Sequence, residues 1–240
     1  MNAFEQPGYG EGKALRRVQV VFVVDTTHSM GEVSEALKDE IAEVAEIYSS
    51  FRMKSEFGLI EFRHLPTDDS PYSSLRRLTD GWIDDPSIFS RIVSGLVAKG
   101  GGSFRESVNE ALGLACDSNW DNARSTTRVI VLATDTKPDM RPDWTTETAR
   151  DAFTRAGIDQ FYYLINPSYA DEFHIITEAK DRSGNDITSC EIPMELPLDR
   201  EKIREQFREF AQHSGYSIPP IAPESNDSED DEQNGNVVGL

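Results

Sequence analysis

The chain has 240 residues, of which 38% are hydrophobic, and its 43 acidic and 24 basic residues give a net charge of -19. This length fits one α/β domain with tails, or at most two small domains. A surface this acidic repels nucleic-acid phosphates and anionic lipids, so we expect neither nucleic-acid nor membrane binding.

The N-terminal part begins with a segment, residues 1–16, that is rich in Gly and charge and is expected to be flexible. Residues 18–24 are nearly all β-branched or aromatic, which is typical of a strand buried on both faces. Asp25, Thr27 and Ser29 then place oxygen-bearing side chains on alternate positions of a short loop. Residues 30–51 follow with apolar side chains three and four positions apart, which predicts a long helix.

The middle of the chain alternates between strand and helix patterns. It predicts a strand at 55–63, an antiparallel edge strand within 72–80 and a helix at 84–99 with Asp85 as cap and Pro86 at its first position. A Gly-rich stretch and a helix at 104–119 come next. The β-branched residues 126–135 then predict a central strand.

The C-terminal part predicts a helix at 144–157 ended by Gly157, a strand at 159–166, a short helix at 168–180, a strand at 186–192 and a helix at 199–213. Residues 214–240 are Pro-rich and then acidic, with no Lys or Arg in the last twenty-two, and are expected to be a disordered tail. The folded domain therefore spans 17–213. Without a signal peptide or an apolar run that could span a bilayer, we expect a soluble cytoplasmic protein.

Two cysteines, Cys116 and Cys190, are present. They lie far apart in the sequence and form no CxxC pair. We expect two small buried thiols and neither a disulfide nor a metal site.

Strands that alternate with helices predict an α/β fold: a doubly wound, Rossmann-like, mostly parallel six-stranded sheet with one antiparallel edge strand and helices on both faces. In this strand order the first strand lies beside the strand at 126–135, at the switch point where ligands bind. One strand runs into Asp25 and the other into Asp135. We therefore expect the two carboxylates to meet at one edge of the sheet.

Three loops are expected to converge at that edge: 25–29, 100–103 and 135–137. Two carboxylates, several hydroxyls and free backbone carbonyls form a set of oxygen ligands only, which suits Mg²⁺, Mn²⁺ or Ca²⁺ and does not suit zinc. Because two carboxylates leave a divalent cation short of negative charge, an Asp or Glu of a partner would complete the site.

Four segments in this order resemble the von Willebrand factor A family: VVFVVDTTHSM, FGLIEFRHLP, LVAKGGGSFRESVNEAL and VIVLATDTKPD. The metal-ion-dependent adhesion site of that family reads DxSxS, then a Thr- or Gly-rich loop, then TD, and the third segment is similar to a GGGDxPE-type loop variant. The resemblance covers residues 18 to about 212. It implies metal ligands at Asp25, Thr27, Ser29 and Asp135, a variable ligand at Gly102 or Ser103, and a partner-binding rim at His28, Met30, Phe104 and Lys137.

Two departures from the family pattern concern the ligands. Thr27 stands where Ser is usual and keeps a hydroxyl. Gly102 stands where many members have a coordinating Thr, and Ser103 where the loop variant has Asp.

The resemblance implies a protein-binding scaffold without catalytic residues, in which Mg²⁺, or Mn²⁺ or Ca²⁺, bridges to an Asp or Glu of a protein partner. Bacterial members of the family act beside AAA+ ATPases or in modules with kinases or phosphatases. A partner of that kind is therefore an expectation from the resemblance.

Other interpretations stay open. Thr27 and Ser29 could cap the first helix. Asp25 could serve a metal-dependent phosphoryl hydrolase, because VVFVVDTT resembles the start of haloacid-dehalogenase phosphatases, although Thr27 occupies the place of their second acid. The domain could also work without metal, by surface contacts alone. A nucleophile–base pair of Ser29 and His28 is disfavoured, since neighbours in sequence do not face each other, and GGGS lacks the spacing of a nucleotide-binding loop.

Overall fold

The central feature of the computed structural model is a six-stranded sheet with the strand order β3-β2-β1-β5-β7-β8. The structure describes residues 17–50, 53–64, 75–100, 105–139 and 141–194, together with Glu201 and Glu205. The strands are β1 (Arg17–Asp25), β2 (Lys54–Phe62), β3 (Leu75–Arg77), β5 (Thr126–Thr134), β7 (Gln160–Ile165) and β8 (Thr188–Pro193). Neighbours pair in parallel except β2 and β3, which are antiparallel. The predicted doubly wound sheet is confirmed.

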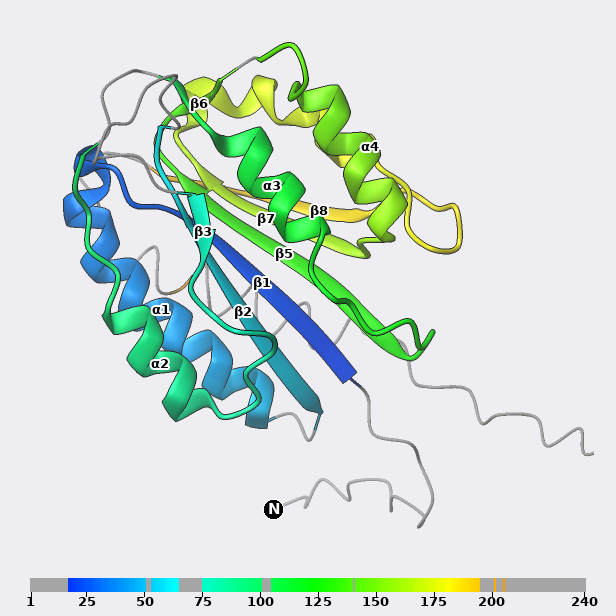
Figure 1. Cartoon of the computed structure of the whole chain (residues 1–240), viewed down its shortest axis with the longest axis horizontal. Helices are drawn as coiled ribbons and strands as arrows, with labels where there is room; N and C mark the ends of the chain where they lie inside the picture. The colour runs from blue at the N-terminus through cyan, green and yellow to red at the C-terminus, as the bar shows by residue number, and fades with distance from the viewer. Residues whose placement is uncertain are drawn as a thin grey trace, which may run out of the picture.

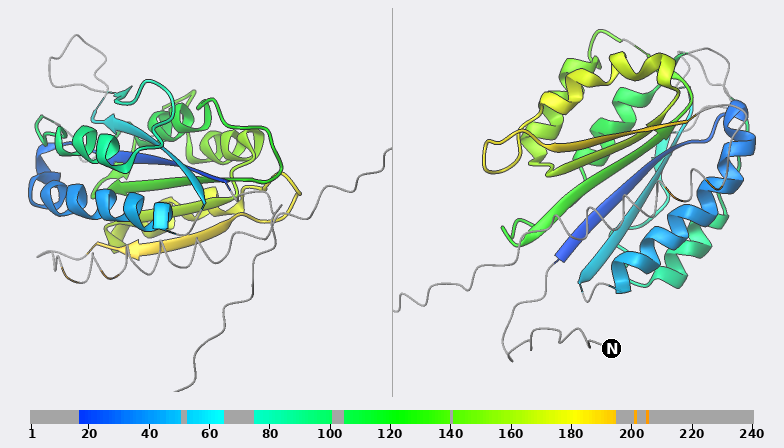
Figure 2. Two further views of the ribbon diagram at one scale, coloured as in Figure 1. Left: turned by 90° about the horizontal axis from the view of Figure 1, so that it is seen from below. Right: turned by 180° about the vertical axis from the view of Figure 1, so that it is seen from behind.

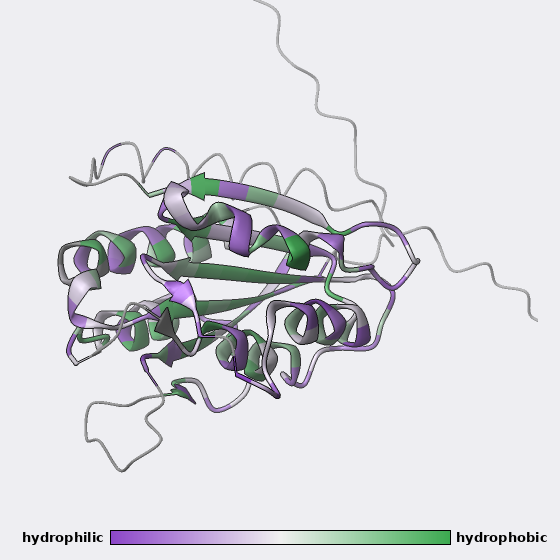
Figure 3. Cartoon of the chain, turned by 90° about the horizontal axis from the view of Figure 1, so that it is seen from above, coloured by the Kyte–Doolittle hydropathy of each residue, from purple (hydrophilic) through white to green (hydrophobic). Residues whose placement is uncertain are grey.

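Helices cover both faces of this sheet (Figure 1, Figure 2). Helices α1 (Gly31–Ser50) and α2 (Pro86–Ser94) lie side by side on one face, and α3 (Val108–Cys116) and α4 (Thr146–Ala156) lie on the other. The alternation of β1 divides its side chains between two apolar cores: Phe22 packs on the side of α1 and α2, whereas Val21 packs on the side of α3. Figure 3 shows the resulting pattern, with hydrophobic strands inside and hydrophilic residues along the helices.

Helix α2 begins as its sequence predicts but ends earlier. The Asp85 carboxylate accepts hydrogen bonds from the amides of Ser87 at 2.8 Å and Ile88 at 3.2 Å, and Pro86 takes the first helical position. The helix ends at Ser94 and not at residue 99, because Gly95 is a poor helix former and Leu96 turns back into the core.

The segment expected to form one short helix at 168–180 forms two 3₁₀-helices instead, η2 (Pro167–Glu172) and η3 (His174–Glu178). The buried side chains Phe173, Ile176 and Ala179 recur at every third residue. This spacing matches the three residues per turn of a 3₁₀-helix, which keeps all of them against the sheet.

The structure also contains a small parallel pair of strands, β4 (Arg105–Glu106) and β6 (Lys137–Pro138), that the sequence did not predict. Each strand has only two residues, too few to show a periodic pattern.

Gly157 ends α4 with a φ of 58°, as expected for a glycine in the left-handed conformation.

Several predictions concern the chain ends and the cysteines. The segment 1–16, the tail 214–240 and the helix at 199–213, apart from the helical Glu201 and Glu205, lie outside the described residues. Within the described part, no helix combines the length and apolar character needed to cross a membrane. Cys116 is buried as predicted, but the prediction is wrong for Cys190, which is exposed because β8 is an edge strand.

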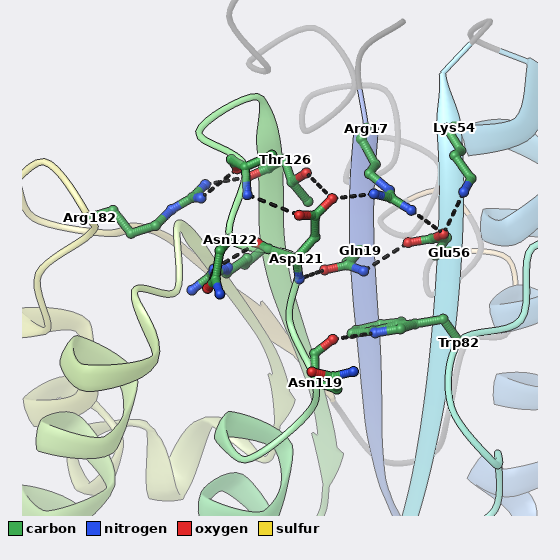
Figure 4. Close-up of polar contacts among 12 residues, drawn as sticks. Arg17, Gln19, Lys54, Glu56, Trp82, Asn119, Asp121, Asn122, Thr126 and Arg182 are labelled. Carbon is green, nitrogen blue, oxygen red and sulfur yellow. Dashed lines mark hydrogen bonds and ion pairs between the residues drawn. The ribbon is translucent and has the colours of Figure 1, made fainter.

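A polar network joins the amino ends of β1 and β2 to the loop before β5 (Figure 4). Arg17 donates to Glu56 at 2.7 Å and also to Asp121. Glu56 further accepts from Gln19 at 2.8 Å and lies 2.9 Å from the ammonium of Lys54. Burial acts to raise the pKa of Glu56, but these donors outweigh it and hold that pKa below its usual value.

We predict that Glu56→Gln lowers the free energy of unfolding by about 1–3 kcal/mol at pH 7, because the network loses its charged acceptor. A lowered folded-state pKa gives a stabilisation that is present above the unfolded value of about 4.3 and is lost as the pH falls through the folded value. The deficit of the variant should therefore shrink below pH 4 in urea titrations at several pH values. Glu35→Gln is the control, since Glu35 is 63% exposed and its ion pair within the described residues is the one with Lys38. An equal stability of Glu56→Gln and wild type at pH 7 would contradict the prediction.

Candidate metal centre

The candidate site lies where β1 and β5 end side by side. The two strands pair in parallel up to Val24 and Ala133, so both carboxyl ends reach the same edge of the sheet. Asp25 is the last residue of β1, and Asp135 directly follows the last residue of β5. The expected meeting of these two strand ends is confirmed.

Asp25 is completely buried and surrounded by uncharged donors. Its Oδ1 accepts the amide of Thr27 at 2.8 Å, and its Oδ2 accepts the hydroxyl of Thr134 at 2.7 Å. The Thr136 hydroxyl reaches the same Oδ2 at 3.5 Å and lies 3.2 Å from that of Thr134. Thr134 and Thr136 were not among the predicted site residues, although their place on either side of Asp135 is a signal that could have identified them.

A chain of hydroxyls links Asp25 to Asp135. The Oγ1 of Thr27 lies 3.1 Å from the Oγ of Ser29, and the Ser29 hydroxyl donates to Asp135 Oδ1 at 3.2 Å. Thr27 occupies the capping position of η1 (His28–Met30), yet its side chain accepts no capping hydrogen bond from a backbone amide of that helix. The capping interpretation is therefore wrong for Thr27, whose hydroxyl faces the candidate site.

The pKa values of both carboxyl groups, Asp25 and Asp135, are raised. The pKa of Asp25 is raised to about 6: burial is the main cause and the charge of Asp135 a smaller one, while the hydrogen bonds from Thr27 and Thr134 oppose the rise. Burial also raises the pKa of Asp135, against the hydrogen bond from Ser29. Two neighbouring carboxyl groups with raised pKa values are typical of a site where a bound cation would stabilise the charged carboxylates.

The described residues that precede and follow the loop with the variable ligand are paired with the other two predicted loops or their neighbours. Before it, Gly100 has a φ of 73° and its carbonyl accepts the amide of His28 at 3.0 Å, and the amide of Lys99 donates to loop 25–29 at 2.9 Å. After it, β4 pairs with β6, which follows Asp135. Gly102, Ser103 and Phe104 themselves lie outside the described residues.

The predicted rim needs one correction. His28 is exposed, and Lys137 is half-buried, 2.6 Å from a carboxylate oxygen of Glu172 and 5.0 Å from the ring centre of Tyr169. Met30 is fully buried in the core beside α1. A rim role for Met30 is wrong, because η1 turns its side chain inward.

The set of donors fits a hard cation only in part. Among the described residues, no group of three or more His, Cys, Asp or Glu side chains is arranged to hold a metal ion. Asp25 and Asp135 supply two carboxylates, and Thr27 and Ser29 supply hydroxyls, all of them oxygen ligands of the kind that Mg²⁺ and Ca²⁺ prefer. A further anionic ligand would have to come from outside this cluster.

Solved structures resemble this chain in fold. A von Willebrand factor type A protein from Catenulispora acidiphila matches with a TM-score of 0.56 and 16% identity, over 84% of this chain and 43% of that one. The chain has a von Willebrand factor A-like fold. Proximal thread matrix protein 1 from the mussel byssus matches the same fold with a TM-score of 0.56 and 10% identity, over 84% of this chain and 47% of that one.

The von Willebrand factor A-like chain thus spans less than half the length of each of these proteins. No protein-family model matches its sequence, and no curated protein matches it. Identities this low bear on the fold alone, so any function has to be argued from the site.

Proposed function

We propose that this chain is a protein-binding domain that binds a divalent cation, Mg²⁺ or else Mn²⁺ or Ca²⁺, and uses it to engage an acidic residue of a protein partner. Asp25, Thr27 and Ser29 would hold the ion together with Asp135, which acts directly or through water. Gly102 or Ser103 would add a contact from the third loop. When bound, the ion would supply a positive charge that a carboxylate of the partner can reach.

The observation that carries this proposal is the fully buried Asp25 beside a second carboxylate, with hydroxyls between them and no cationic side chain among the donors that its hydrogen bonds show. A buried carboxylate without a positive partner is costly, so an arrangement that maintains it favours a bound cation. The net charge of -19 adds to this argument, because an acidic partner would otherwise be repelled.

The same cluster does not favour catalysis. Ser29 donates its hydroxyl hydrogen bond to Asp135, and His28 is exposed. Ser29 and His28 therefore do not form a pair of nucleophile and base. Thr27 stands where the phosphatase mechanism would need an acid. We therefore propose a binding function, of the scaffold kind, in which the partner could be an AAA+ ATPase or a kinase or phosphatase module.

Calorimetric titration of the full chain with Mg²⁺, Mn²⁺ and Ca²⁺ tests the proposal. We expect saturable binding in the wild type and at least a tenfold weaker affinity in Asp135→Asn, because one of two charged ligands is lost. Asp171→Asn is the matched control, since the Asp171 side chain is fully exposed and lies on η2. An absence of binding in the wild type would favour an interaction domain that works without metal.

Partner binding has its own readout. Proteins captured from native cell extract by the wild type should be released by a chelator and should be absent with Asp135→Asn. Turnover of p-nitrophenyl phosphate in the presence of Mg²⁺, if lost in Asp25→Asn, would replace the proposal by the phosphoryl hydrolase.

A further inference from the structure

A buried arginine connects loop 25–29 of the candidate metal centre with residues 96–100, which lead into the second predicted loop. Arg63 directly follows β2, and its side chain is only 5% exposed. Its Nε donates to the carbonyl oxygen of Thr26 at 3.0 Å, and its Nη2 donates to that of Val97 at 3.4 Å. One guanidinium therefore bonds to loop 25–29 and to loop 96–100 at the same time.

Thr26 is the point where these contacts converge. Its carbonyl oxygen accepts the amide of Lys99 at 2.9 Å in addition to the Nε of Arg63. Its amide donates to the carbonyl of Phe62 at 3.0 Å, and the residue is completely buried. Since Thr26 stands between the first two candidate ligands, the orientation of its peptide decides where both of them lie.

The charge of Arg63 is balanced inside the protein. Its Nη2 lies 3.6 Å from Glu61, which is 3% exposed and also pairs at 2.7 Å with Arg76 on the edge strand β3. Burying such a pair gains little stability over apolar side chains of similar volume. Stability alone therefore does not explain an arginine here, whereas a planar group with several donors is what two separate carbonyls require.

We propose that Arg63 is a positioning residue for the candidate metal centre: by bonding to Thr26 and Val97 it holds loops 25–29 and 96–100 in the geometry that binds the ion. The inference rests on the proposed function for the ion itself. Outer contacts of metal ligands typically change affinity by about 10–100-fold when they are removed.

The first test compares ion affinities by calorimetry with Mg²⁺ and Mn²⁺. The double variant Arg63→Met/Glu61→Gln removes both buried charges and should stay folded while it binds about 10–100-fold more weakly. Arg63→Lys keeps the charge but offers a compact ammonium, so we expect an intermediate loss. Arg76→Met is the control: it removes the 66% exposed partner of Glu61 without touching either loop, and its affinity should equal that of the wild type.

The second test, amide hydrogen exchange, requires no ion. In the double variant the amides of Lys99 and His28, which bond between the two loops, should exchange at least about tenfold faster, while the amides of β5 keep their protection. Unchanged exchange at Lys99 and His28, or a uniform acceleration that includes β5, would overturn the positioning role. If the wild type binds no ion, the proposed function fails, and the exchange data still decide whether Arg63 holds the loops.

Discussion

Asp25→Asn is expected to stabilise the ion-free protein and to abolish cation binding at the same time. The pKa of Asp25 is raised to about 6 by burial, whereas an unfolded Asp titrates near 3.9. The native state therefore binds this proton more tightly than the unfolded state does. Its contribution to stability is present at acid pH and is lost as the pH rises from about 4 to about 6.

The size of this effect follows from the shift of about two pKa units, which corresponds to about 3 kcal/mol at neutral pH. Asparagine removes the charge but can keep the hydrogen bonds: its oxygen can accept the amide of Thr27, and its amide group can donate to the hydroxyl of Thr134. At pH 7.5 in a chelator the melting temperature of Asp25→Asn should thus rise by about 5–10 °C.

The addition of Mg²⁺ should cancel most of this difference in stability between the variant and the wild type. An ion at one hundred times its dissociation constant adds about 2.7 kcal/mol to the wild type, and we expect no gain in Asp25→Asn, which has lost a charged ligand. Thermal unfolding between pH 4 and pH 8, with and without Mg²⁺, measures both effects. The control Asp171→Asn should follow the wild type throughout. A variant that is less stable than wild type at every pH would show that Asp25 is needed as a structural acceptor and carries no strained charge.

Phe89→Ala is expected to cost about 3–5 kcal/mol, the range for removing a large aromatic side chain from a core. Phe89 has no exposed surface, and its ring centre lies 5.7 Å from that of Phe22 on β1 and 5.1 Å from that of Phe57 on β2. It therefore anchors α2 to strands β1 and β2. Urea unfolding at pH 7 measures the loss.

The neighbouring Ile88 provides the matched control. It lies in the same turn of α2 but is 40% exposed, so Ile88→Ala should change the free energy of unfolding by less than about 1 kcal/mol. Both variants introduce the same alanine, and its helix propensity affects both alike. Similar losses in the two variants would mean that the aromatic cluster around Phe89 contributes little.

The fold could be predicted because its signals are local. The unbroken β-branched strands β1 and β5 indicate burial on both faces, and such strands separated by helices form parallel sheets with the carboxyl ends together. It follows directly that Asp25 and Asp135, at the ends of these two strands, lie close to each other. The division of 168–180 into two 3₁₀-helices and the burial of Met30 were missed, since short turns carry weak local preferences and packing decides them.

The sequence by itself determined the alternation of strands and helices, and with it the edge of the sheet where Asp25, Thr27, Ser29 and Asp135 meet, because periodicity and strand order depend on residue type and spacing alone. Only the tertiary structure decided that Thr134 bonds to Asp25, that Lys137 pairs with Glu172 and that Arg63 holds the loop at Thr26. Such contacts join residues 35 to more than 100 positions apart. They depend on where the packed elements place each side chain, and no local pattern encodes that distance.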